Sequence, residues 1–260
     1  MKTLKFLSLA VIATIGLVSC DKEENNQSED EAIKTKNAIS SGEGGSMAQF
    51  TIIDDYLYTV DYKSLNVFHI VNPDQPTLLE KIDLGIGIET IFPQNDHLFI
   101  GTQNGVKIYD VTNPRSPEEV SEFEHVTSCD PVIANDDYAL ATLRGGTACG
   151  GNLSLLSILD ISNLENPIEI STTTLINPYG LGFLSSNENL AFICDGYDGL
   201  KLVDFTDPLV PQILVTYPQF EAIDVIEEDN QLILLTRQGV YQFDASNPAE
   251  LIELSFIPVM

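Results

Sequence analysis

The chain has 260 residues, a formal net charge of −27 and a hydrophobic fraction of 43%. Its Lys and Arg residues are scattered singly, so no basic stripe exists that could replace the counterions of a nucleic acid, and we exclude nucleic acid as a partner. The hydrophobic fraction is typical of a globular core.

Residues 1–19 have the features of an export signal. Lys2 and Lys5 precede residues 6–18, an uncharged apolar stretch that is too short to span a bilayer. The stretch leads into Leu-Val-Ser before Cys20, which resembles the lipobox of bacterial lipoproteins, where the cysteine is lipidated and becomes the mature N-terminus. An ordinary secretory signal cut near the same point is the alternative. We therefore expect a signal peptide over 1–19 and lipid attachment at Cys20.

Residues 20–45 are expected to be the lipidated cysteine and a flexible acidic linker. Residues 21–45 are mainly Asn, Ser, Glu, Lys and Gly, and they have too few apolar side chains to build a core. The start of the linker, Cys-Asp-Lys-Glu-Glu, resembles the acidic export signal that sends lipoproteins of Bacteroidota to the outer face of the outer membrane. The resemblance implies a lipid-anchored protein on the cell surface, with the periplasmic face of that membrane as the alternative.

Residues 46–260 repeat one phrase, of which "VKIYDVTNP" at 106–114 and "LKLVDFTDP" at 200–208 are two copies. The copies recur at intervals of roughly 40 to 50 residues, which is the period of a propeller blade. Between them lie short apolar runs bounded by Asn, Asp, Gly and Pro, which are strand signals, and no segment has helical period. We therefore predict an all-β, five-bladed β-propeller of four-stranded blades. One aligned position is filled by His69, Asp110, Asp160, Asp204 and Asp244.

Each copy of the phrase ends in a predicted type I turn, usually Asn or Asp followed by Pro, although the third copy has Leu164 in place of the Pro. The aligned Asp precedes a Ser or Thr by two residues and is expected to cap this turn, so we assign these carboxylates to the scaffold. Within the third strand, an aliphatic position alternates with a mostly polar one that holds Lys107 and Lys201. The alternation predicts one buried and one mostly solvated face.

"GVKIYDVTNPRSPEEV" and "GLKLVDFTDPLVPQIL" resemble the LVIVD repeat, a propeller-forming repeat of bacterial and archaeal surface proteins, and the likeness covers about residues 46–260. The resemblance implies a propeller and a surface location but no particular activity. Since five blades account for the whole region, we expect the ring to be complete in one chain and the protein to be a monomer. The first and last blades are expected to meet by packing alone, or through a closing strand from residues 32–40.

Three cysteines follow Cys20, in a compartment that permits disulfides. In a blade, the loop leading into the first strand and the loop between the second and third strands share one face of the ring. Cys129 and Cys149 lie in one loop of each kind in the third blade, so we predict that they form a disulfide. We expect a buried free thiol at Cys194, with a bridge between Cys149 and Cys194 as the alternative.

The same face is the predicted binding face. The loop "LRGGTACGGN" makes the third repeat longer than its neighbours, and insertions on one face often mark a binding surface. Neighbouring loops add polar and aromatic side chains around a central depression. The alternative is that their Gly, Asn and Asp residues serve only the tight turns. The predicted binding face comprises Asp130, Arg144, Asn177, Tyr179, Asp195, Tyr197 and Asp198.

No catalytic residue, metal ligand or cofactor site is predicted. The chain has no nucleophile elbow and no Gly-rich phosphate loop, and its histidines, which are predicted on different faces, are His69, His97 and His125. The favoured interpretation is a noncatalytic surface lipoprotein, anchored by its lipid, that binds an extracellular protein or glycan. The rival is a calcium-assisted hydrolase or lactonase of propeller type, with oxygen ligands from Asp130, Asp195 and Asp198.

Overall fold

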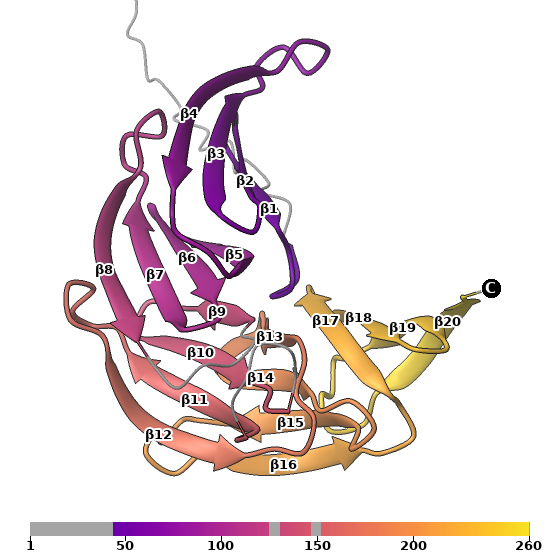
Figure 1. The fold of residues 1–260 in the computed structure, drawn as a ribbon. Coiled ribbons are helices and arrows are strands. Elements are labelled where there is room, and N and C mark those ends of the chain that lie inside the picture. Colours follow the sequence, from indigo (N-terminus) through magenta and orange to yellow (C-terminus); the bar gives the residue numbers. More distant parts are fainter. Residues whose placement is uncertain (1–43, 125–130, 147–151, 260) are drawn as a thin grey trace, which may run out of the picture. The chain divides into compact units, whose positions relative to one another are not determined.

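A computed structural model describes residues 44–124, 131–146 and 152–259, which lie in one compact unit of the chain. These residues form twenty β-strands in five antiparallel sheets of four strands each (Figure 1). The predicted all-β, five-bladed propeller is confirmed. In this part of the chain, no helix is long and apolar enough to cross a membrane.

The strands of each blade follow chain order from the first, innermost strand to the fourth, outermost one. Blade 1 comprises β1 (Phe50–Ile53), β2 (Tyr56–Val60), β3 (Ser64–His69) and β4 (Thr77–Asp83). Blade 2 comprises β5 (Ile88–Gln94), β6 (His97–Thr102), β7 (Gly105–Asp110) and β8 (Glu118–Glu124). Blade 3 comprises β9 (Val132–Ala134), β10 (Tyr138–Leu143), β11 (Leu155–Asp160) and β12 (Ile168–Thr174). Blade 4 comprises β13 (Leu181–Leu184), β14 (Asn187–Cys194), β15 (Leu200–Asp204) and β16 (Gln212–Tyr217), and blade 5 comprises β17 (Ala222–Glu228), β18 (Gln231–Thr236), β19 (Gly239–Asp244) and β20 (Ile252–Pro258).

The repeated phrase forms the third strand of a blade and the turn that follows it, as predicted. In blade 2 the carbonyl of Asn113 accepts the N–H of Ser116 at 3.0 Å, and Asp110 Oδ1 accepts the N–H of Thr112 at 2.6 Å. Hydrogen bonds from Thr112 lower the pKa of Asp110, because they favour its charged form. The same carboxylate cap recurs at Asp160, Asp204 and Asp244.

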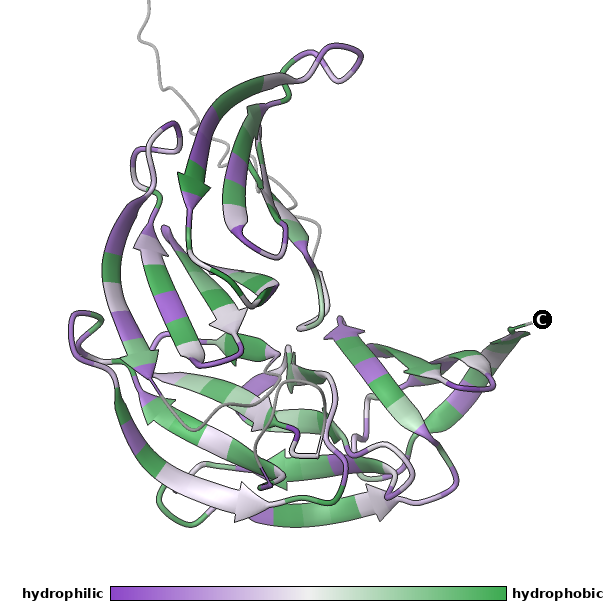
Figure 2. Ribbon diagram, in the orientation of Figure 1, coloured by the Kyte–Doolittle hydropathy of each residue, from purple (hydrophilic) through white to green (hydrophobic). Residues whose placement is uncertain are grey.

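The apolar cores lie between consecutive blades, where apolar residues line the strands (Figure 2). The prediction of a solvated face on the third strands was wrong, because Ser157 and Lys201 are only 2% and 5% exposed. Both faces of an internal blade pack against neighbouring blades, so the alternation within a strand separates two cores and does not separate core from solvent.

Among the residues that the structure describes, each of the two terminal blades has a neighbouring blade on one face only. In β18, Leu232 and Leu234 pack toward blade 4, while Ile233 and Leu235 are 36% and 38% exposed. At the equivalent position of blade 4, Phe192 is 0% exposed, because blade 5 covers it. The expectation that the first and last blades pack together is therefore not met, and residues 32–40, the alternative closing strand, lie outside the described ranges.

Candidate functional site

Two pockets lie at opposite ends of the innermost strands. In a four-stranded antiparallel blade, the first-to-second and third-to-fourth connections share one end, here called the turn face, which carries the Asn-Pro turns. The remaining connections form the other end, here called the groove face. A pocket of about 400 Å³, the central pocket, includes residues from the turn-face hairpins. A pocket of about 340 Å³, the groove, is lined from the groove face.

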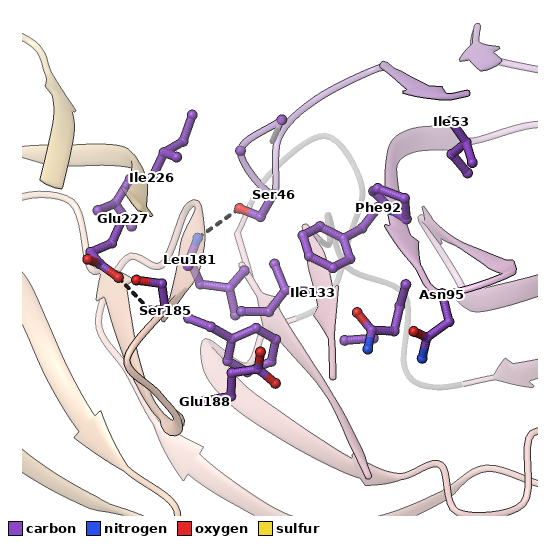
Figure 3. Close-up of a pocket in the computed structure, with 18 residues that line it drawn as sticks. Ser46, Ile53, Phe92, Asn95, Ile133, Leu181, Ser185, Glu188, Ile226 and Glu227 are labelled. Atoms are coloured by element: carbon purple, nitrogen blue, oxygen red, sulfur yellow. Dashed lines mark hydrogen bonds between the residues drawn. The ribbon is translucent and has the colours of Figure 1, made fainter. Parts of the chain in front are cut away.

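Innermost strands of all five blades line the central pocket, together with residues 44–46 (Figure 3). Ser46 Oγ accepts the N–H of Leu181 at 2.8 Å and donates to Asp224 Oδ1 at 3.4 Å. Glu227 accepts the backbone N–H groups of Ser185 and Asn230. Ser46 and Glu227 are thus engaged in holding the innermost strands and the segment before β1.

Asp224, whose carboxylate accepts the hydroxyl of the pocket residue Ser46, has a perturbed pKa. Burial raises its pKa to about 6, although hydrogen bonds from the N–H of Val225 and from Ser46 act in the opposite direction. Gly45 and Gly180 lie close to the carboxylate of Asp224, and a Cβ atom at either position would collide with it. Sequence reasoning missed Asp224, since it lies outside the repeated phrase; the Gly-Gly-Ser stretch before the first strand was the available signal.

The groove is built by loops that sequence reasoning placed on one face. Its most distinctive contact is between Arg144, which follows β10, and Tyr179, which precedes β13: the guanidinium carbon lies 4.0 Å from the centroid of the phenol ring. The exposed Tyr62 from the β2–β3 loop also lines the groove. The rest of the lining is largely apolar or uncharged, apart from Glu89, and comprises Met47, Gln49, Ile88, Thr90, Pro131 and Pro178.

Two arginine side chains, those of Arg144 and Arg237, act on the phenol of Tyr179. Burial acts to raise the pKa of its phenol, but the charge of Arg144, a hydrogen bond from Asn177 and the charge of Arg237 together lower that pKa below its ordinary value. Arg237 is exposed and pairs with Glu221 at 2.6 Å. The chain as a whole is strongly acidic, so this corner of the groove face differs in charge from the rest of the protein.

Asp195 organises the loop beside Tyr179. Its side chain is fully buried and accepts the N–H groups of Ile176 and Asn177, at 3.0 and 2.6 Å. Lys201 Nζ lies 3.2 Å from Asp195 Oδ2 and 2.6 Å from Asp198 Oδ2. Lys201, which sequence reasoning assigned to a solvated face, is therefore the cation that joins two of the predicted face residues.

The predicted binding face thus divides into two groups. Arg144 and Tyr179 line the groove, whereas Asn177, Asp195 and Asp198 form the hydrogen-bonded support of the neighbouring loop, and Tyr197 in that loop is exposed. The other predicted residues, the face residue Asp130 and the disulfide pair Cys129 and Cys149, lie outside the described ranges.

Two further predictions concern single side chains. Cys194 is buried and free, as predicted. Burial raises the pKa of its thiol, so the group is neutral and packs as a small apolar side chain. Within the described ranges, no group of three or more His, Cys, Asp or Glu residues is placed to hold a metal ion.

Comparison with known proteins agrees with the repeat and the fold. The model of the LVIVD repeat matches residues 94–124 and 152–174, which lie in blades 2 and 3. No curated protein matches the sequence. Among solved structures, a protein from Lactobacillus plantarum is similar with a TM-score of 0.64 at 14% identity, over 79% of this chain and 69% of that one.

Two other similar structures carry functional descriptions. A putative 6-phosphogluconolactonase from Bacteroides fragilis has a TM-score of 0.63 at 14% identity, over 82% of this chain and 72% of that one. A chain of a nidogen/laminin complex has a TM-score of 0.57 at 13% identity, over 80% of this chain and 77% of that one. At such identities the likeness concerns the fold alone, since one fold hosts many functions.

Proposed function

We propose that this chain is a noncatalytic binding module whose groove receives a protein or glycan. The observation that carries the proposal is the contact of Arg144 with Tyr179 in the wall of the groove, beside the exposed ring of Tyr62. Tyr and Arg are the residue types enriched in binding hot spots, and a mostly apolar pocket with a few polar groups is typical of ligand sites.

The noncatalytic interpretation is supported by the way in which the nearby carboxylates are used. Asp195 and Asp198, the described candidates for calcium ligands, both bind the ammonium group of Lys201. A calcium ion would have to displace Lys201 and the backbone N–H groups that Asp195 accepts. The rival, a calcium-assisted hydrolase or lactonase, therefore has weaker support than a binding module.

The proposal includes a lipid anchor at Cys20 and display on the outer face of the outer membrane. It rests on the sequence of residues 1–24, with the uncharged stretch, the Leu-Val-Ser-Cys motif and the acidic residues that follow. Attachment to the membrane would place the groove where extracellular proteins and glycans are the available ligands.

Binding to a glycan panel and to isolated cell-envelope proteins tests the proposal. We expect Arg144→Ala and Tyr179→Ala to weaken binding at least about tenfold, the loss typical of a hot-spot residue. Arg115→Ala is the matched control, because Arg115 lies in an Asn-Pro turn on the turn face and contacts Tyr56. Equal binding by all three variants would contradict the assignment of the groove, and calcium-dependent hydrolysis of a panel member would support the rival.

A further inference from the structure

The four interfaces between consecutive blades share one pattern. Each blade presents to the following blade the second-strand residue that pairs with the third-strand position two before the capping Asp. In blades 2, 3 and 4 these residues, Phe99, Leu140 and Phe192, are at most 1% exposed. The following blade presents the adjacent residues of its own second strand to the same core, as Leu232 and Leu234 do in blade 5. A blade therefore has a leading face and a receiving face.

A hydroxyl group crosses every one of these interfaces. The acceptor lies in the turn that follows the third strand of the next blade. It is the backbone carbonyl of the residue directly after the Asn or Asp of that turn, and in the four interfaces this residue is Pro114, Leu164, Pro208 or Pro248. Two of the donors, Ser121 and Ser171, occupy the same place in the fourth strand of their blades. The other two are Tyr58 and Tyr217.

Blade 5 has a complete leading face, and none of the described residues outside the blade packs against it. Ser255 occupies in β20 the position that Ser121 and Ser171 occupy in the fourth strands of blades 2 and 3. Each of these serines pairs with the third-strand residue two before the capping Asp, and for Ser255 this residue is Gln242. Instead of a carbonyl in a next blade, Ser255 contacts Gln242 at 3.2 Å. The apolar residues of the same face are at least partly exposed, and they are Ile226, Ile233, Leu235, Val240 and Ile257.

Blade 1 has the complementary receiving face. Its turn carries Pro73 at the place whose carbonyl accepts the hydroxyl in the other blades, and Phe50 and Leu78 are 58% and 51% exposed. Leu57 and Phe68 lie between them on the same face and are half-buried. In blade 2 the positions equivalent to Phe50, Leu57 and Phe68 are buried against blade 1, and they hold Ile91, Leu98 and Tyr109. The position of Leu78 stays exposed in the internal blades.

We propose that blade 5 of one copy packs against blade 1 of a second copy through the surfaces by which consecutive blades pack within the chain. The two faces carry the two halves of an interface that the chain already forms four times, and neither is covered by the described residues of its own chain. The contact is head-to-tail, because two different surfaces meet. The hydroxyl of Ser255 then donates to the carbonyl of the partner's Pro73.

Charge sets the conditions for this association. Thr59 and Asn66 lie at the centre of the blade 1 face and Gln242 and Ser255 at the centre of the blade 5 face, and all four are uncharged. Lys81, which pairs with Asn66, is the neighbouring charged residue in blade 1. The chain as a whole has a net charge of −27, so two copies repel each other at long range. Association is therefore expected to strengthen as added salt screens this repulsion.

Molar mass in solution tests the proposal. The full chain with Cys20→Ser, which cannot carry a lipid, is measured by light scattering after size-exclusion chromatography across a concentration and salt series. We expect a mass above that of one chain that rises with salt. Ile233→Glu should weaken association about a hundredfold, because an unpaired carboxylate would be buried in an apolar contact. A monomer under all conditions would overturn the proposal.

Ile252→Glu is the control within the same blade. Its equivalent in blade 3, Ile168, remains 55% exposed although blade 4 follows, so this position lies outside the interface and the substitution should leave the mass unchanged. Circular dichroism checks that each variant retains its strands. Equal loss of association in Ile233→Glu and Ile252→Glu would contradict the assigned face.

Mixing two variants tests the head-to-tail arrangement. Ile233→Glu destroys the leading face and Leu57→Glu the receiving face, because the equivalents of Leu57 in the other blades, such as Leu98 and Leu232, are fully buried. Neither variant should associate alone through this interface. A mixture retains one intact leading face and one intact receiving face and should yield a one-to-one complex. If the mixture remains monomeric while the parent chain associates, the contact is not between blade 5 and blade 1.

Discussion

Asp224 illustrates how a single buried carboxylate makes stability depend on pH. Its pKa is raised from 3.8 to about 6 in the folded chain, so between these pH values the folded protein holds a proton that the unfolded protein has lost. Its contribution to stability is therefore present at low pH and is lost as the pH rises from about 4 to about 6. We expect Asp224→Asn to be more stable than the parent chain at pH 7, by up to about 3 kcal/mol.

Urea unfolding at a series of pH values measures this difference. The two chains should be nearly equal in stability below about pH 4. Asp110→Asn should behave in the opposite way: the pKa of Asp110 is lowered by hydrogen bonds from Thr112, so its contribution exists above the ordinary pKa and is lost as the pH falls. A constant difference between the parent chain and Asp224→Asn at every pH would contradict this account.

Lys201 is the second residue with a clear energetic prediction. Its ammonium group lies beside the fully buried Asp195, so Lys201→Met would leave a buried carboxylate without its countercharge. We expect a loss of about 3 to 5 kcal/mol, and partial recovery when Asp195→Asn is added. Thermal unfolding of the single and double variants measures both effects. A double variant less stable than Lys201→Met would show that Asp195 does not depend on Lys201.

At the scale of the element, blades 2, 4 and 5 need a glycine where the third strand starts, whereas blades 1 and 3 have Ser64 and Leu155 there. A Cβ on Gly105, at the start of β7, would overlap the carbonyl oxygen of Phe123 in β8, and the equivalent Gly199 and Gly239 face carbonyl groups in the same way. We expect Gly105→Ala to cost about 2 to 4 kcal/mol, because the pairing of the two strands must shift. The exposed neighbouring residue gives the control, Asn104→Ala, which should change stability little. Chemical denaturation measures the stability of both variants. Equal stability of Gly105→Ala and Asn104→Ala would contradict the requirement for glycine at this position.

The strands and turns were predictable because their signals are local. The Asn-Pro turn and its Asp cap depend on residues within one phrase, and five copies of the phrase set the number of blades. The exposure of the third strand was not predictable from alternation, since Lys201 and Ser157 are buried by neighbouring blades. Burial in a repeat protein depends on which unit lies next to the strand, and the strand's own sequence does not record this.

At the scale of the whole molecule, part of the candidate site was predictable. Blade topology placed Arg144 and Tyr179 on one face, and the structure brings them into contact. The roles of Asp195 and Asp198 were not predictable, because the cation that binds them comes from a strand position expected to be solvated. Asp224 was missed for a similar reason: its environment is created by Ser46 and Gly45, which are far from it in the sequence.

The proposed lipid anchor gives a further prediction about the whole molecule. Cells expressing the protein should hold it in the membrane fraction and incorporate labelled palmitate, and Cys20→Ala should abolish both, because the proposal assigns the lipid to this residue alone. Protease added to intact cells should digest the protein if it is displayed on the surface. Palmitate incorporation in Cys20→Ala would contradict the assigned attachment site.

Occupancy of the groove is the most direct test of the proposed function. The chain contains no Trp, so Tyr62→Trp places a single fluorescent reporter in the lining of the groove, and Leu209→Trp places one in an exposed Asn-Pro-type turn on the turn face. Titration with the glycan panel and envelope proteins should give a saturable change for Tyr62→Trp, lost when Arg144→Ala is added, and none for Leu209→Trp. A change confined to Leu209→Trp, or no change in either reporter, would contradict a binding site in the groove.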